Sequence, residues 1–384
     1  MKRINLNVDF TFSNPSTCLP LKIKNSLTKL AGRKINKTIN FFKPKNFRHS
    51  KSIHENENLA SEAKLLSTWL EEGFPSMFVE GYSAEIGTQV MSGLLWILPG
   101  MDLHEPVVLV TARTIALGGI YDDILDTDGK YIKEEFRPIK ENLLKSVLAL
   151  LRLGLEMDLY AAESIRVEPF IQSFCILMIK NFMSLGLTDP TDLVKRISSQ
   201  ITTVATNMMT CDWISRNQMH ASPRRYSMDV VRRFRAMDDA LPIFAEHFYN
   251  VRYGPLPSWV LASPQLQIFK SVALHISSGL NDVFGFKKDI IKGEPDGMIM
   301  QRIGWGEEPL SVFEEELKIL QEYIEDYVLL REELFVHFPE VINYVEMVDS
   351  YLYGYIQAMK NSTRYLLDGM IYFDDDELDS EDID

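Results

Sequence analysis

Apolar residues recur at intervals of three and four through most of this chain, and this spacing is the strongest constraint on its fold. Residues 143–165, 169–186 and 312–335 each carry the pattern. The pattern is typical of amphipathic helices that bury one face. Alternating Val- and Thr-rich segments joined by Asn-Gly turns are missing from the body of the chain. The sequence therefore predicts an all-α fold, with one helical domain over residues 58–372.

The two ends of the chain differ in composition from this helical body. Residues 1–54 contain 12 Lys and Arg and a single acid, Asp9. This composition predicts a basic, disordered extension over residues 1–57. The alternative is an organelle transit peptide within residues 1–54. Eight of the last eleven residues are acidic, so we expect residues 373–384 to be a disordered, solvated tail.

Charge and cysteine content exclude several classes of function. The net charge is −14, and an acidic surface repels the phosphate backbone, so we expect no nucleic-acid partner. No apolar run reaches the roughly 18–20 residues of a transmembrane helix, so we expect no membrane-spanning segment. The three cysteines are far apart and lack CxxC spacing, which predicts a reducing, cytoplasmic location.

One expected helix, ending in the sequence IYDDILDTDG, carries the first cluster of acids. It contains Asp122, Asp123, Asp126 and Asp128. Residues at i and i+4 share a helix face, so Asp122 and Asp126 point the same way and repel each other. A hard cation such as Mg²⁺ would relieve this repulsion. The alternative is a solvated helix end, since the acidic tail shows that Asp-Asp pairs also occur here without a site.

A second polar cluster follows another apolar helical segment, in the sequence NDVFGFKKD. Asn281, Gly285 and Asp289 lie at i, i+4 and i+8 and would form one stripe on a helix. Asn281 offers a carbonyl oxygen and Asp289 a carboxylate, both hard metal ligands, and Lys288 is adjacent to meet a phosphate. Taken alone, this stripe would be ordinary helix surface. It becomes informative when it is paired with the first cluster.

Together the two clusters resemble those of the class I terpene synthases, especially the single-domain microbial type, over most of residues 60–370. The resemblance implies a helical barrel that binds three Mg²⁺ ions, with Mn²⁺ as an alternative, around an isoprenoid diphosphate substrate. Asp122, Asp123 and Asp126 match the family's aspartate-rich motif. Asn281 and Asp289 match its second metal-binding motif, and Gly285 lies at the motif position between them. The resemblance also implies a monomer or a homodimer.

Further signatures of the same family fall at the expected distances. Arg235 lies 46 residues before Asn281, where the family has an arginine that senses diphosphate. Asp238 and Asp239 follow it and resemble the segment that links this arginine to catalysis. Arg364-Tyr365 resembles the family's C-terminal Arg-Tyr pair. The resemblance therefore implies that these residues and Lys288 assist departure of the diphosphate.

The chain also departs from the family pattern. Gly285 stands where the family has Ser or Thr, and Asp289 where it has Glu, so one ligand oxygen is missing and metal affinity is expected to change. Ala116, Gly119 and Ala358 stand where many members have aromatic residues. These small side chains predict a larger cavity, and hence geranylgeranyl diphosphate rather than farnesyl diphosphate as substrate.

The sequence thus predicts a Mg²⁺-dependent cyclase that ionises and cyclises a linear isoprenoid diphosphate. One alternative is an isoprenyl diphosphate chain-elongating synthase, which would carry a second DDxxD motif in place of NDVFGFKKD. The other is a degenerate, non-catalytic relative that Gly285 has made inactive. Aromatic residues are candidate walls of the cavity, although ordinary core packing is the favoured interpretation of each; they are Phe78, Trp96, Phe174, Phe248, Phe284 and Trp305.

Overall fold

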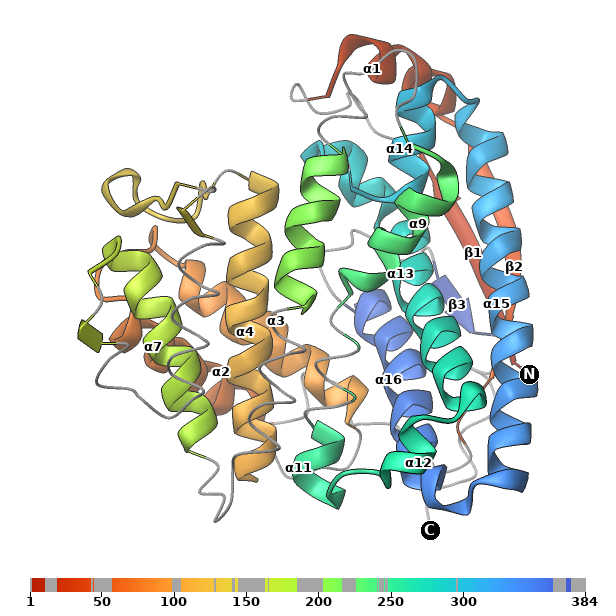
Figure 1. The fold of residues 1–384 in the computed structure, drawn as a ribbon. Coiled ribbons are helices and arrows are strands. Elements are labelled where there is room, and N and C mark those ends of the chain that lie inside the picture. The colour runs from red at the N-terminus through yellow and green to blue at the C-terminus, as the bar shows by residue number, and fades with distance from the viewer. Residues whose placement is uncertain are drawn as a thin grey trace. The chain divides into compact units, whose positions relative to one another are not determined.

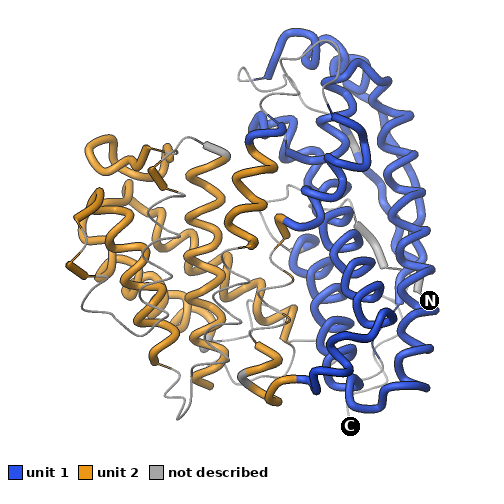
Figure 2. Tube along the Cα trace, viewed as in Figure 1, with its two compact units in different colours: residues 1–47, 213–237, 256–384 blue, residues 48–212, 238–255 orange. Residues whose placement is uncertain are grey.

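The computed structural model describes most of the helical body and part of each end. The described residues are 2–10, 19–42, 44, 57–98, 105–127, 129–139, 142–143, 163–164, 166–184, 203–215, 226–239, 241, 245, 248–294, 296–361 and 371–373. The chain divides into two compact units (Figure 2). Unit 1 comprises residues 1–47, 213–237 and 256–384, and unit 2 comprises residues 48–212 and 238–255.

Unit 2 is built from helices. Its labelled elements are α2 (Glu57–Gly73), α3 (Tyr82–Ile97), α4 (Pro106–Thr127), the 3-10 turn η3 (Glu134–Phe136), α7 (Pro169–Met183) and α11 (Tyr249–Tyr253). α2 packs against α3, and α4 packs against α3 and α7 (Figure 1). A buried amide joins α7 to α4, because Asn181 Nδ2 donates to Val110 O at 3.0 Å and to Thr114 Oγ1 at 3.1 Å. Residues 203–215 are also helical.

Unit 1 combines long helices with a small sheet. Its helices are α1 (Leu21–Leu27), η1 (Thr28–Leu30), α9 (Met228–Met237), α12 (Ser258–Leu261), α13 (Pro264–Lys292), α14 (Met298–Trp305), α15 (Pro309–His337), η5 (Pro339–Val341) and α16 (Ile342–Asn361). α13 and α15 run side by side, and α9, α14 and α16 also pack on α13 (Figure 1). The helices confirm the all-α class predicted for the body of the chain.

The sheet has the strand order β2–β1–β3. Its strands are β1 (Lys2–Asp9), β2 (Lys34–Phe41) and β3 (Ile371–Phe373). β1 pairs antiparallel with β2, from Lys2 opposite Phe41 to Asp9 opposite Lys34. On its other edge β1 pairs with β3, so the first and last described segments of the chain are joined. The predicted acidic tail lies outside the described residues, except for Phe373, which ends β3.

The structure differs from the expectation that residues 1–57 are disordered. Ile4, Leu6, Val8 and Phe10 alternate with polar residues, and all four are buried. The Phe10 ring packs against Phe286 of α13 at 5.6 Å and against Phe313 of α15 at 6.2 Å between ring centroids. The high Lys and Arg content of this segment hid a strand pattern of period two. The N-terminal segment is therefore part of the hydrophobic core of unit 1.

In the part of the chain that the structure describes, none of the helices combines the length and the apolar character needed to cross a bilayer.

Candidate functional site

The second predicted motif lies in the C-terminal half of α13. The helix starts at Pro264, and the Ser263 hydroxyl caps it by accepting the Leu266 N–H at 3.3 Å. It ends at Gly293, whose φ of 82° is the left-handed conformation that glycine adopts readily. The predicted stripe of Asn281, Gly285 and Asp289 therefore lies within one continuous helix.

Gly285 is the point at which the two expected metal ligands converge. A methyl group added at Gly285 would lie 3.5 Å from Asn281 Oδ1, 3.7 Å from Asp289 Oδ1 and 3.8 Å from Asp289 Oδ2. The amide oxygen and the carboxylate therefore project over the same turn of α13. Both are hard oxygen ligands of the kind that Mg²⁺ takes alongside water and phosphate oxygens. The structure thus brings together all three residues of the predicted stripe.

Asp289 belongs to a buried cluster of charges. Lys288 Nζ lies 3.2 Å from Asp289 Oδ1 and 2.8 Å from Glu294 Oε2. Burial raises the pKa of Asp289 to about 7; the charge on Lys288 opposes this rise, and the charge on Glu294 adds to it. Lys288 was expected to meet a phosphate, whereas here its ammonium group pairs with two carboxylates. Its role as a phosphate ligand stays a prediction.

Arg235 is held by the residue next to Asn281. Arg235 lies in the last turn of α9, and its Nε and Nη2 each lie 2.9 Å from Asp282 Oδ1. Both side chains are largely buried, with exposed fractions of 12% for Arg235 and 4% for Asp282. The other oxygen, Asp282 Oδ2, accepts the Met298 N–H at 2.8 Å. One carboxylate therefore joins α9, α13 and the first turn of α14.

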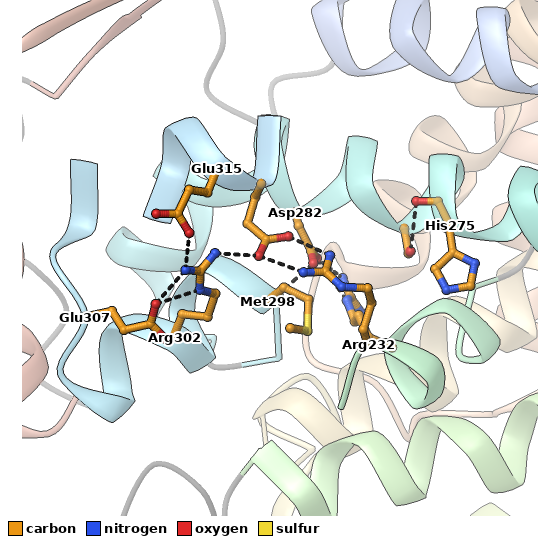
Figure 3. Close-up of polar contacts among 10 residues, drawn as sticks. Arg232, His275, Asp282, Met298, Arg302, Glu307 and Glu315 are labelled. Carbon is orange, nitrogen blue, oxygen red and sulfur yellow. Dashed lines mark hydrogen bonds and ion pairs between the residues drawn. The ribbon is translucent and has the colours of Figure 1, made fainter. Parts of the chain in front are cut away.

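A second set of ion pairs ties the same helices to α15. Arg232 of α9 binds Glu316 through two hydrogen bonds, of 2.7 and 2.9 Å. Arg302 of α14 donates to Glu316 at 3.0 Å and also binds Glu307 and Glu315 (Figure 3). Such bidentate arginine–carboxylate pairs fix orientation as well as distance. They hold α9 and α14 on α15, at the same end of α13 as the stripe.

A small cavity lies beside these ion pairs. Residues of α9, α13, α14 and α15 line it, among them Arg232, Arg235 and His275, whose ring stacks on Tyr323. Burial lowers the pKa of His275. The cavity volume of about 20 Å³ is enough for a single water-sized molecule and far too small for an isoprenoid chain.

The first predicted cluster lies in unit 2, at the C-terminal end of α4. Asp122 and Asp123 are half-buried, and Asp126 is in the same helix, which ends at Thr127. The Tyr82 hydroxyl donates to Asp123 Oδ2 at 2.6 Å. Carboxylates at a helix C-terminus face the negative end of the helix dipole, and the last turn of α4 contains no basic residue. This placement costs stability and favours a site for a cation.

Of the remaining predicted site residues, the structure describes Asp238 and Asp239. Asp238 and Asp239 follow the end of α9, and Asp239 Oδ1 accepts the Leu241 N–H at 2.8 Å, which gives Asp239 a local role in the turn. Asp128, Arg364 and Tyr365 lie outside the described residues.

The candidate wall residues lie mostly in the core of their own units. Five of them have exposed fractions below 9%, and Trp305 is half-buried; the five are Phe78, Trp96, Phe174, Phe248 and Phe284. Ala116 is fully buried, whereas Gly119 and Ala358 are half-buried. Among the described residues beyond the neighbouring backbone of α4, no atom lies within 4 Å of a Cβ added at Gly119. A methyl group at this position therefore meets no clash with those residues.

The chain resembles known proteins in its structure and not in its sequence. No protein-family model matches the sequence, and neither does any curated protein. Solved structures do match. 2-Methylisoborneol synthase from Streptomyces coelicolor A3(2), in complex with Mg²⁺ and 2-fluoroneryl diphosphate, superposes with a TM-score of 0.61 at 11% identity, covering 84% of this chain and 98% of that one. The fold is that of the class I terpene synthases.

Two further structures support this assignment of the fold. A variant of cucumene synthase matches with a TM-score of 0.60 at 12% identity, covering 84% of this chain and all of that one. α-Eudesmol synthase matches with a TM-score of 0.61 at 14% identity, covering 84% and 98%. At these identities the likeness establishes the terpene synthase fold and leaves the activity to be argued from the site.

The predicted metal-binding residues of α13 would supply only some of the oxygen ligands that a Mg²⁺ ion needs. Among the described residues, no three His, Cys, Asp or Glu side chains come together in a way that would hold a metal ion on their own. In the α13 stripe, Asn281 and Asp289 supply oxygen and Gly285 supplies none. A site with few protein ligands fits Mg²⁺, which keeps several waters and is completed by phosphate oxygens.

Sequence reasoning missed Asp282. Only the first, fifth and ninth positions of NDVFGFKKD were predicted as ligands, and the acid at the second position was left without a role. Its pairing with Arg235 is a tertiary contact across 47 positions of sequence, which the helical pattern of α13 does not reveal. Asp282 could have been noticed from the sequence, because it lies on the face of the helix where the apolar residues recur, and a buried acid needs a partner.

Proposed function

We propose that this protein is a Mg²⁺-dependent terpene cyclase that ionises a linear isoprenoid diphosphate, cyclises the resulting allylic cation, which loses a proton to give the hydrocarbon, and releases diphosphate. The observation that carries the proposal is the convergence of Asn281 Oδ1 and the Asp289 carboxylate over Gly285, on a helix of a class I terpene synthase fold. Arg235 is held by Asp282, the residue next to Asn281. The 2-methylisoborneol synthase with the same fold was solved with Mg²⁺ and an isoprenoid diphosphate analogue.

In this proposal two groups of residues hold the metal ions. Asn281 and Asp289 contribute oxygens from α13, and Asp122, Asp123 and Asp126 contribute carboxylates from α4. Bound Mg²⁺, expected as three ions or replaced by Mn²⁺, supplies positive charge that stabilises the departing diphosphate. Gly285 supplies no ligand oxygen but leaves room between Asn281 and Asp289.

Basic and hydroxyl side chains complete the neutralisation of the leaving group. Arg235 offers N–H donors in a planar array that matches phosphate geometry. Lys288, Arg364 and the Tyr365 hydroxyl add further donors, and Asp238 and Asp239 connect Arg235 to the segment that follows α9. The ionisation needs no protein nucleophile, because the C–O bond breaks as charge accumulates on the diphosphate.

The preferred substrate in this proposal is geranylgeranyl diphosphate. Ala116, Gly119 and Ala358 leave room where aromatic side chains would shorten the cavity. Gly119 supports this choice because, outside the backbone of α4, no atom of the described residues lies within 4 Å of an added Cβ. Farnesyl diphosphate is the alternative substrate, and a C15 product would point to it.

The test is to incubate the purified protein with geranyl, farnesyl and geranylgeranyl diphosphate separately, with and without Mg²⁺. Released diphosphate is quantified, and hydrocarbon products are identified by gas chromatography with mass spectrometry. We expect Mg²⁺-dependent release from a single allylic substrate and a cyclic C20 hydrocarbon. Release that requires isopentenyl diphosphate as co-substrate would show a chain-elongating synthase. No release under any condition would show a non-catalytic relative.

Two variants connect this activity to the site. Asp289→Asn removes the charge of one proposed ligand while keeping its shape, and we expect loss of about a hundredfold or more in diphosphate release, as is typical when charge stabilisation is lost. Glu322→Gln on α15 is the matched control, because this acid is 61% exposed and lies outside the proposed site. Equal activity of both variants would refute the assignment of Asp289.

A further inference from the structure

Asp282 occupies a position between two proposed functional residues. Its Oδ1 accepts the Nε–H of Arg235 at 2.9 Å and also lies 2.9 Å from Arg235 Nη2 as an ion pair, and its Oδ2 accepts the backbone N–H of Met298 at 2.8 Å. Both oxygens of a nearly buried carboxylate are therefore bound by donors from two different helices, α9 and α14. Figure 3 shows Asp282 beside Met298.

The same carboxylate lies next to Asp289. A methyl group added at Gly297, which immediately precedes α14, would be 3.2 Å from Asp282 Oδ1 and 3.3 Å from Asp289 Oδ2. The two carboxylates therefore pack on the same side of Gly297. Displacing the Asp282 carboxylate would therefore alter its ion pair with Arg235 and its packing beside the Asp289 carboxylate.

An acid beside an anion-binding arginine reduces the arginine's attraction for a phosphate, so its presence needs a reason. One N–H of the guanidinium, at Nε, is hydrogen-bonded to Asp282 Oδ1, and Nη2 lies at the same distance from that oxygen, so the ion pair restricts the orientation of the whole group. In a largely buried setting this pair is screened little by water. A fixed guanidinium binds a ligand with less loss of side-chain entropy than a mobile one.

We infer that Asp282 is a positioning residue that orients Arg235 toward the substrate diphosphate and couples it to the metal-ligand side of α13. The inference rests on the proposed function, because it assigns diphosphate as the ligand of Arg235. Asp282 acts through Arg235 and is not itself a ligand of diphosphate. Its role in capping α14 is separate and purely structural.

The experiment measures binding of inorganic pyrophosphate in the presence of Mg²⁺ by isothermal titration calorimetry. It uses the full chain in four forms: wild type, Asp282→Asn, Arg235→Gln and the double variant. The amide introduced by Asp282→Asn has one acceptor oxygen for the donors of Arg235 and Met298, so at least one contact is lost. We expect Asp282→Asn to weaken pyrophosphate binding by about tenfold in the wild-type background and by less than about twofold beside Arg235→Gln.

The matched control is Glu316→Gln. It neutralises another buried acid that binds an arginine of α9, Arg232, and leaves Arg235 paired. We expect a loss of thermal stability similar to that of Asp282→Asn, with pyrophosphate affinity changed by less than about twofold. If Asp282→Asn does not fold, Asp282→Glu takes its place, since it keeps the charge and displaces the carboxylate by one methylene group.

The outcomes separate this inference from the proposed function. Equal weakening by the Asp282 variant in both backgrounds, or no weakening in either, would overturn the positioning role even if wild-type protein binds Mg²⁺ and pyrophosphate. Wild-type protein that binds no pyrophosphate with Mg²⁺ and releases none from allylic substrates would overturn the proposed function and this inference together.

Discussion

At the scale of single residues, Gly285 is the clearest departure of the site from the terpene synthase pattern. An added Cβ would make contacts of 3.5 to 3.8 Å with Asn281 and Asp289, which are ordinary van der Waals distances, so a β-carbon is accommodated without a clash. A serine hydroxyl at this position would lie next to both proposed oxygen ligands, where we expect it to bind a cation.

We therefore expect Gly285→Ser to strengthen Mg²⁺ binding. The Mg²⁺ concentration for half-maximal diphosphate release should fall by roughly tenfold, the lower end of the effect that supporting residues have on metal affinity. Gly285→Ala is the control, because both substitutions remove the helix penalty of glycine, about 0.5–1 kcal/mol, and only serine adds an oxygen. An equal response of the two variants would show that Gly285 affects only helix stability.

At the scale of elements, α15 and α16 are joined by a buried polar cluster that carries its own pH dependence. The Tyr327 hydroxyl donates to Asp349 Oδ1 at 2.7 Å, and Arg331 Nη1 lies 3.2 Å from Asp349 Oδ2. Burial raises the pKa of Asp349 to about 6, and Arg331 and Tyr327 oppose part of this rise. The cluster lies outside the proposed metal site, so it can be tested through stability alone.

The sign of the effect follows from the raised pKa. Protonated Asp349 is favoured in the folded state, so its contribution to stability is fully present below about pH 3.9, the ordinary pKa of Asp, and is lost as the pH rises to about 6. Between pH 4 and pH 7 the free energy of unfolding of the wild type should fall, relative to Asp349→Asn, by on the order of 2–3 kcal/mol. Urea unfolding at each pH measures this, with Asp326→Asn as an exposed control on α15. A difference between wild type and Asp349→Asn that stays constant with pH would contradict the prediction.

The elements also show what the sequence could and could not predict. The three-four spacing over residues 312–335 predicted α15, which forms a single helix over Pro309–His337. β1 was missed although Ile4, Leu6, Val8 and Phe10 alternate, because the whole of residues 1–54 was judged by its basic composition, whereas β1 itself contains only Lys2 and Arg3. The stripe of Asn281, Gly285 and Asp289 follows from helix geometry alone. The contact of Arg235 with Asp282 does not, because it depends on how α9 packs against α13.

At the scale of the whole molecule, the basic N-terminal segment packs against helices of the acidic remainder of unit 1. Phe10 packs on α13 and α15, and Lys37 of β2 lies 2.7 Å from Glu314 of α15. Phe286, one of the contacts of Phe10, is the residue after Gly285 in the proposed motif. The segment therefore supports the motif helix on a face other than that of its ligands.

This packing predicts that the segment cannot be removed as a transit peptide would be. Phe10→Ala should lower the free energy of unfolding by about 3–5 kcal/mol, the usual cost of truncating a buried phenylalanine, and deletion of residues 1–42 should prevent recovery of soluble protein. Chemical denaturation measures the first effect, with Leu21→Ala as the control, since Leu21 is 72% exposed. Unchanged stability after the deletion would instead support a removable leader.

The proposed preference for a C20 substrate can be tested at Gly119, one of the three small residues on which that preference rests. Gly119 lies in α4, two turns or less before Asp122 and Asp126, and outside the backbone of that helix no atom of the described residues lies within 4 Å of an added Cβ. In the proposed function, a phenylalanine at this position occupies volume that a C20 chain would need. A C15 chain is shorter by one isoprene unit and is affected less.

We expect Gly119→Phe to reduce turnover of geranylgeranyl diphosphate by at least about tenfold and to keep turnover of farnesyl diphosphate within about threefold, because misplacing a reacting carbon by about 1 Å can cost a hundredfold in rate. Gly118→Phe is the matched control: an added Cβ there also meets no atom within 4 Å, but the side chain points about 100° further round α4. Competition between the two substrates in one reaction, with product analysis, measures the ratio directly. A ratio that shifts equally in both variants would show that bulk anywhere on this turn disturbs the enzyme and that Gly119 does not set substrate length.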